Sequence, residues 1–259
     1  MTSTAAKAAT LRDLHAAPEL LKVVNVWDVA SAKAVAGLEG TTALATASHS
    51  IAASYGYPDG EQIPVDLMIE AIGRIAAATE LPVSADLEAG YGDPGETVRK
   101  AIGVGIVGAN LEDQMKPLAD AVAAVEAVVK AAEQEGVPFV LNARTDAYAL
   151  GRGRDRADVL ADAIERGKAF LDAGATVVFV PARLDEPSVV ALVDAFGPQK
   201  LTMIGVPGTL PLARLEELGV ARVSYGPISQ RVALTALAEF AERIIGGDGS
   251  LPENLRALN

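Results

Sequence analysis

The stretch RADVLADAIERGKAFLDAGATVVFVP, Arg156–Pro181, contains the unit from which the rest of the chain is built. Its first part, Arg156–Asp172, has the composition of a helix, and Gly174 follows at a position where a left-handed residue commonly ends one. The run Thr176–Pro181 is short, β-branched and continuously apolar, which is typical of a strand buried on both faces. A helix that leads directly into such a strand predicts a parallel sheet.

The same unit recurs along the whole chain. The other expected strands are Val23–Trp27, Thr42–Ala47, Pro82–Leu87, Ile106–Glu112, Phe139–Ala143, Leu201–Gly205 and Arg222–Tyr225. The other expected helices are Ala30–Ala36, Val65–Ala78, Gly95–Ile102, Leu118–Glu135, Pro187–Ala195, Pro211–Glu217 and Ser229–Ile245. Eight strands in 259 residues predict a closed (β/α)8 barrel of the TIM type, with a doubly wound open sheet as the alternative.

We expect one barrel domain over residues 1–259, because no linker rich in Pro, Gly or Ser divides the chain. A short flexible segment is expected at about 1–10 and a tail at about 247–259. Only the second strand lacks an immediate helix, and the connection after it, Ser48–Pro64, is long enough to suggest a functional loop.

Composition narrows the class of protein. The formal net charge is −12, which argues against a nucleic-acid partner because such proteins need a basic face. The chain has no cysteine, which excludes disulfides, thiolate metal sites and a thiol nucleophile. It shows no apolar run as long as a membrane span and no signal peptide. We therefore expect a cytoplasmic enzyme without a membrane partner.

Acidic residues gather where the third and fourth strands end. Asp86 and Glu88 are spaced to point the same way from an extended segment, and Glu112 ends the neighbouring strand. Carboxylates side by side repel one another and are stabilised by a cation, and oxygen ligands suit Mg²⁺ or Mn²⁺. The alternative is that Asp86 and Glu88 cap the following helix.

A basic residue follows the fifth strand. Arg144 offers a fixed positive charge for a carboxylate or a developing oxyanion, or else it is the buried partner of Asp113 or Asp146. His49 is the one histidine placed after a strand, where substrate contact and a turn or capping role are both open.

Five ordered motifs resemble those of the isocitrate lyase / phosphoenolpyruvate mutase superfamily. They are Asn25-Val-Trp-Asp28-Val-Ala-Ser-Ala32, Gly56-Tyr-Pro-Asp59-Gly, Ser84-Ala-Asp-Leu-Glu-Ala-Gly-Tyr-Gly92, Asn110-Leu-Glu-Asp-Gln114 and Asn142-Ala-Arg-Thr-Asp146. The resemblance implies a Mg²⁺-dependent barrel that forms a homotetramer, a dimer of dimers in which the eighth helix is exchanged between paired subunits.

The resemblance also implies roles for individual residues. Asp86 matches the direct metal ligand, Glu88 and Glu112 match positions that hold the metal through water, and Asp59 matches a further acid nearby. The resemblance assigns contacts with a 2-oxo or 2-hydroxy acid to Trp27, Ala47, Ser48, His49, Asp86 and Arg144. Among these matched positions, Arg144, Glu112 and Asp59 are the catalytic candidates.

The departures from the family pattern bear on the reaction. The lyases of the superfamily carry a mobile loop with a catalytic cysteine after the strand-four acids, whereas Gln114–Leu118 here runs almost directly into a helix. The longer loop of the phosphonomutases is missing too. Glu88 replaces the more common aspartate, and Pro181 stands where mutases typically have a histidine.

A site with metal ligands and an arginine but no thiol suits decarboxylation or C–C cleavage beside an oxo group. The leading hypothesis is therefore a C–C lyase or decarboxylase acting on a small 2-oxo acid such as oxaloacetate, through an enolate. The alternatives are P–C bond chemistry, as a mutase or hydrolase of a phosphonopyruvate-like compound, and a non-catalytic barrel that binds an oxo acid.

Overall fold

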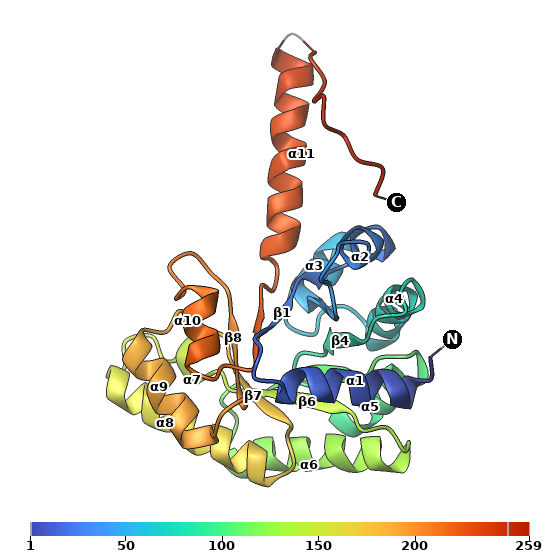
Figure 1. Cartoon of the computed structure of the whole chain (residues 1–259). Helices are drawn as coiled ribbons and strands as arrows, with labels where there is room; N and C mark the ends of the chain where they lie inside the picture. Colours follow the sequence, from blue (N-terminus) through green and yellow to red (C-terminus); the bar gives the residue numbers. More distant parts are fainter. Residues whose placement is uncertain (1, 248, 259) are drawn as a thin grey trace.

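The computed structural model describes residues 2–247 and 249–258, and in them a single parallel sheet closes into a barrel (Figure 1). The strand order is β1-β9-β8-β7-β6-β5-β4-β3-β2. Strand β1 (Leu21–Val23) pairs with β9, and β2 (Asn25–Val26) pairs with β3. Only Val24 separates β1 from β2, so they are two halves of one broken strand, and this strand closes the barrel. The predicted TIM-type barrel is confirmed, and the open sheet is ruled out.

Helices alternate with the remaining strands as the sequence predicts. The strands are β3 (Leu44–Thr46), β4 (Val83–Asp86), β5 (Gly108–Glu112), β6 (Val140–Arg144), β7 (Val177–Val180), β8 (Leu201–Ile204) and β9 (Arg222–Ser224). The helices are α1 (Thr4–Ala16), α2 (Val29–Ala36), α3 (Ser48–Ser54), α4 (Val65–Ala77), α5 (Pro94–Gly103), α6 (Leu118–Gln134), α7 (Ala147–Leu150), α8 (Arg156–Asp172), α9 (Glu186–Phe196), α10 (Leu212–Glu217) and α11 (Ile228–Gly246).

Two expectations about connections need correction. The segment expected to be flexible at about 1–10 instead forms most of α1 from Thr4 onward, because Ser3 caps the helix and Ala8 is fully buried. The long connection after the second predicted strand begins with helix α3 rather than a loop. The tail forms no helix or strand over 249–258, while Met1, Asp248 and Asn259 lie outside the described residues.

The wall of the barrel is buried on both faces. All four residues of β7 are buried, as its continuous apolar run predicts. Polar side chains cross the interior in a chain of hydrogen bonds: the Thr202 hydroxyl donates to Asn142 Oδ1 (2.7 Å), and Asn142 Nδ2 donates to Asn110 Oδ1 (2.7 Å). This chain ties β8, β6 and β5 together beneath the carboxyl-end opening.

Helix α1 lies against the amino ends of the strands. Leu11 packs there with residues such as Leu21 and Val140, which begin strands β1 and β6. His15, near the end of α1, is buried, and its Nδ1 hydrogen-bonds the Leu11 carbonyl oxygen (2.8 Å). Arg222, the first residue of β9, is also buried, and its nearest polar partner is the Ser84 hydroxyl (3.3 Å).

Helix α11 projects from the barrel as an isolated rod (Figure 1). Large apolar side chains on it are exposed: Val232, Leu234, Leu237 and Ile245 are each more than half accessible. An apolar helix with so little of its own chain against it is typical of a surface that another molecule covers. Within residues 2–247 and 249–258, no helix combines the length and the apolar character needed to cross a bilayer.

Candidate active site

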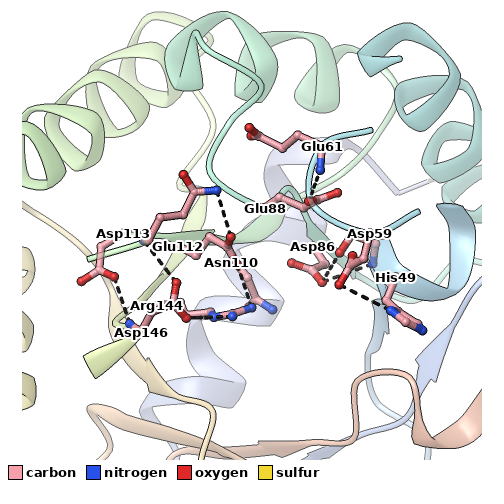
Figure 2. Close-up of polar contacts among 12 residues, drawn as sticks. His49, Asp59, Glu61, Asp86, Glu88, Asn110, Glu112, Asp113, Arg144 and Asp146 are labelled. Carbon is pink, nitrogen blue, oxygen red and sulfur yellow. Dashed lines mark hydrogen bonds and ion pairs between the residues drawn. The ribbon is translucent and has the colours of Figure 1, made fainter. Parts of the chain in front are cut away.

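A cavity of about 340 Å³ opens at the carboxyl ends of the strands, where active sites of such barrels form. Figure 2 shows the charged residues that come together there. The lining residues are Asn25, Ser48, His49, Asp59, Gly60, Asp86, Glu88, Asn110, Glu112, Arg144, Phe179, Pro181, Ile204, Ser224, Gly226, Pro227 and Arg231. Of the predicted site residues, all but Trp27 and Ala47 line this one cavity.

Asp86 is the last residue of β4 and is held by the first turn of α3. Its Oδ2 accepts hydrogen bonds from the Ser48 hydroxyl (2.8 Å) and the Ser48 backbone amide (3.2 Å). Its own amide donates to the Thr46 hydroxyl (3.0 Å). Among the described residues these bonds reach only Oδ2, so Oδ1 is available to a ligand. Ser48 thus orients Asp86, and its predicted contact with substrate stays a prediction.

Glu88 lies beyond the end of β4, where its φ of 51° takes the chain out of the extended conformation. Its carboxylate accepts hydrogen bonds from the Glu61 amide and from the Tyr91 hydroxyl (3.1 Å). Burial, together with the neighbouring carboxylates of Asp86 and Asp59, raises the pKa of Glu88 to about 7 despite these two hydrogen bonds. Glu88 and Asp86 share the cavity, but different segments hold their side chains.

Arg144 stands between two carboxylates. Its Nη1 lies 2.8 Å from Glu112 Oε2, and its Nη2 lies 2.7 Å from Asp146 Oδ1. Burial raises the pKa of Glu112 to about 7, with Asp146 and Asp86 adding to the effect and Arg144 opposing it. The predicted alternative partner Asp146 is thus present, yet Arg144 still lines the cavity and faces any anion inside it.

The capping alternative for Asp86 and Glu88 does not hold. Helix α5 is capped by Asp93, whose Oδ1 accepts a hydrogen bond from the Glu96 amide (3.0 Å). The other predicted partner of Arg144, Asp113, instead pairs with Arg166 of α8 (3.0 Å).

His49 and Asp59 face each other across the rim of the cavity (Figure 2). His49 belongs to the first turn of α3, and Asp59 lies in the connection between α3 and α4. The distance from His49 Nδ1 to Asp59 Oδ2 is 3.4 Å, and both side chains are about half exposed. His49 therefore lines the cavity from the first turn of a helix, and its contact with substrate stays a prediction.

Two predicted substrate contacts lie apart from the cavity. Trp27 lines grooves beside α2, on the outside of the barrel. Ala47 is buried, and its carbonyl oxygen accepts the first hydrogen bonds of α3 from Ser50 and Ile51. Ala47 therefore supports the position of Ser48 and His49 without lining the cavity itself.

Four polar residues of the lining were not among the predicted site residues: Asn25, Asn110, Ser224 and Arg231. Arg231 lies in the first turn of α11, and no ion pair joins it to another residue of the described chain. Asn25 connects three strands: its Nδ2 donates to the Thr46 carbonyl (2.8 Å), and its Oδ1 accepts from the amides of Tyr225 (2.7 Å) and Gly226. The sequence signal that could have identified Arg231 is its position in the first turn of the helix that follows the last strand.

The connection between β5 and α6 is short and fixed. Gln114 and Met115 both have a positive φ, and the Met115 amide donates to Asp113 Oδ1 (3.0 Å). Asp146 Oδ2 accepts from the Gln114 amide (3.1 Å), and Arg166 Nη2 donates to the Lys116 carbonyl (2.9 Å). This connection therefore has neither the length nor the freedom of a loop that closes over a ligand.

The donor atoms of the cavity suit a hard divalent cation. Within the described chain, no three His, Asp or Glu side chains converge closely enough to form a ready-made metal cage. Mg²⁺ usually keeps several waters and takes only one or two protein carboxylates, so direct binding by Asp86 with Glu88 and Glu112 acting through water fits this arrangement. The raised pKa values of Glu88 and Glu112 mark a place where added positive charge would be stabilising.

A closed parallel barrel with acids and an arginine at its carboxyl end describes a large class of enzymes. Within that class, the chain belongs to the phosphoenolpyruvate phosphomutase family, whose pattern matches residues 11–245. The resemblance to the isocitrate lyase / phosphoenolpyruvate mutase superfamily is thereby confirmed.

Relatives in this family differ in reaction. A Burkholderia cenocepacia J2315 protein, provisionally described as a phosphonomutase, is 40% identical over 91% of this chain and 99% of its own, with a TM-score of 0.85. The 2,3-dimethylmalate lyase of Eubacterium barkeri is 28% identical over 90% of this chain and 84% of its own. An oxaloacetate acetylhydrolase, solved with its product oxalate, is 26% identical over 99% of this chain and 92% of its own, with a TM-score of 0.86.

Proposed function

We propose that this protein is a Mg²⁺-dependent C–C lyase or decarboxylase that acts on a small 2-oxo acid, with oxaloacetate as the first candidate. The supporting observation is one cavity that combines Asp86, with an oxygen available to a ligand, and Arg144, a cation held in place by Glu112. Mn²⁺ is an acceptable substitute for Mg²⁺ at such oxygen ligands.

The chain's own residues divide the work of such a reaction. Mg²⁺, when bound, supplies a Lewis acid that polarises the oxo group of the substrate. Asp86 would hold the ion and is itself oriented by Ser48. Arg144 stabilises negative charge that develops on the substrate, at a position fixed by its two carboxylate partners. Decarboxylation needs no general base to begin, which suits a chain without cysteine.

The test is to incubate the protein with Mg²⁺ and a panel of 2-oxo acids and to measure pyruvate and CO₂. We expect turnover of at least one acid, abolished by chelation of the metal. Absence of turnover with every acid in the panel would contradict the proposal.

A second candidate is P–C bond chemistry on a phosphonopyruvate-like substrate, favoured by the 40% identity to the protein described as a phosphonomutase. The short connection after β5, which leaves nothing to cover a phosphoryl group, counts against it. Phosphorus NMR of phosphonopyruvate incubated with the protein separates the two candidates.

The homotetramer with exchanged α11 helices is also part of the proposal. Its support is the exposed apolar side of α11, which includes Leu234 and Leu237. We expect the double variant Leu234→Glu, Leu237→Glu to lower the mass measured by light scattering, whereas Glu239→Gln on the same helix leaves it unchanged. An unchanged mass for the double variant would contradict exchange of this helix.

A further inference from the structure

Cleavage beside an oxo group leaves a carbanion, or its enolate form, that must gain a proton at carbon to become the 2-oxo product. For the proposed function, an enzyme that delivers this proton itself needs a donor in the cavity, and the chain has no cysteine to supply it. General acids of this kind are most often histidine, and His49 is the one histidine in the lining.

The other groups at the cavity that could give a proton are already paired, Glu88 with the Glu61 amide and the Tyr91 hydroxyl. The Tyr91 hydroxyl donates to Glu88, and burial raises the pKa of Tyr91. Glu112 is paired with Arg144 at 2.8 Å. Lys116, in the short connection after β5, is not among the residues that line this cavity. Within residues 2–247 and 249–258, no hydrogen bond or ion pair engages His49 Nε2.

The neighbour of His49 is placed to orient it. Asp59 Oδ2 lies 3.4 Å from His49 Nδ1, so the carboxylate can accept a hydrogen bond from Nδ1–H. Nε2 is then the ring nitrogen that exchanges protons with substrate. Hydrogen bonds between catalytic groups are often long before substrate binds, and a separation of 3.4 Å falls in that range. Figure 2 shows this pair beside Asp86, on the side of the cavity away from Arg144.

We propose that His49 is the general acid of the reaction and that Asp59 is its positioning residue. This assignment rests on the proposed function. In decarboxylation of a 2-oxo acid that carries a carboxylate on C3, such as oxaloacetate, the bond between C3 and that carboxylate breaks, its electron pair forms the enolate, and CO₂ leaves. His49 Nε2 then gives its proton to C3, the enolate becomes the 2-oxo product, and solvent water returns a proton to Nε2. No oxidant or other reactant is required.

The most specific test measures the face of the product carbon at which the proton is added, rather than the rate of turnover. Decarboxylation of 3-methyloxaloacetate in D₂O with Mg²⁺ places one deuterium at C3 of 2-oxobutanoate, and NMR after enzymatic reduction reports which face received it. We expect the wild type to give one configuration at C3. The variant His49→Gln should give an equal mixture, because the enol then leaves unprotonated and is ketonised in solution.

A second measurement does not depend on net cleavage. The wild type with Mg²⁺ should exchange the methyl protons of pyruvate with D₂O, and His49→Gln should slow this exchange by about 100-fold or more. Asp59→Asn should slow it less. Oxalate, a planar mimic of the enolate, should bind both variants as tightly as the wild type in calorimetry, which shows that their cavities are intact.

The variant Tyr55→Phe is the matched control, since Tyr55 ends the same helix and does not line the cavity. It should keep the single configuration and the exchange rate. A wild type that turns over substrate while His49→Gln still gives one configuration would overturn the role of His49. A wild type that cleaves no 2-oxo acid and exchanges no pyruvate protons would overturn the proposed function itself.

Discussion

The two ends of the barrel differ in how far their charged side chains are buried and paired. At the amino end, Arg222 is fully buried with one hydroxyl partner, and His15 of α1 is kept neutral by burial. At the carboxyl end, Arg144 is bracketed by Glu112 and Asp146, yet keeps about a quarter of its side chain exposed to the cavity.

This difference indicates that the charged residues of the amino end serve folding stability, whereas those of the carboxyl end serve ligand binding and catalysis. Burial lowers the pKa of His15 to about 3, with Arg222 adding to the effect, so this histidine is uncharged near neutral pH. Burial also lowers the pKa of Arg222 to about 10. The carboxyl end instead keeps its charged groups within reach of a ligand. We expect changes at the two ends to affect different measurements: turnover at the carboxyl end and folding stability at the amino end.

The largest effect should come from Arg144. Replacement by Met removes the fixed positive charge that faces the substrate, and loss of one such contact typically lowers turnover by about 10²–10³-fold. Steady-state kinetics with the active 2-oxo acid measures it. Arg144→Lys is the control that keeps the positive charge but cannot pair with both Glu112 and Asp146. Its turnover should lie between those of the wild type and Arg144→Met. Full activity of Arg144→Met would remove this residue from the mechanism.

A second ion pair, between Arg166 and Asp113, lies near the carboxyl end of the barrel. Breaking it tests whether a buried ion pair there contributes to the folding stability of the protein. The Asp113 carboxylate is almost wholly buried, and Arg166→Met would leave it unpaired. Breaking such a buried pair commonly costs about 3–5 kcal/mol. Urea unfolding should show this loss, with Arg166→Lys losing less. A change below about 1 kcal/mol would mean that water replaces the guanidinium, because an exposed pair is worth no more than that.

At the amino end, acid should destabilise the protein through His15. The unfolded chain binds a proton at a pKa of about 6.5, whereas the folded chain resists it until about pH 3. Stability from this group is therefore complete above pH 6.5 and falls as the pH drops toward 3, by about 2 kcal/mol at pH 5.

The variant His15→Leu isolates that contribution. The difference between the free energies of unfolding at pH 7.5 and pH 5 should shrink by about 2 kcal/mol relative to the wild type, as the linkage relation requires. Other titrating groups contribute equally to both proteins and cancel. An unchanged difference would show that His15 already accepts a proton in the folded state.

The sequence predicts the barrel well because its signal is local. Runs such as Val177–Val180 are apolar on both faces and follow a helix and a glycine, so each strand can be located without its neighbours. Helix α3 was missed because its sequence, SHSIAAS, is rich in serine and lacks a side-chain cap. The start of helix α1 was missed because its Ala-rich segment has weak apolar periodicity, and its burial depends on strand ends far along the chain.

The sequence predicts most of the charged residues that reach the cavity, but it does not predict which of their atoms form hydrogen bonds and ion pairs. Strand ends place Asp86, Glu112 and Arg144 at one rim whatever their rotamers, because parallel strands share an edge. Which atoms meet depends on the loops: the positive φ of Glu88 directs its carboxylate toward Glu61 and Tyr91, and no local pattern gives that direction. Arg231 was missed for a related reason, since a basic residue in the last helix looks like an ordinary surface residue.

Titration of Mn²⁺, followed by the loss of its free signal in electron paramagnetic resonance, tests the central claim about the carboxyl end most directly. The wild type should bind the ion, and oxalate should tighten its binding. Asp86→Asn should weaken Mn²⁺ binding by at least about tenfold and abolish the effect of oxalate, since loss even of an outer ligand costs roughly 10–100-fold. Equal affinity of Asp86→Asn and the wild type for both Mn²⁺ and oxalate would contradict the account.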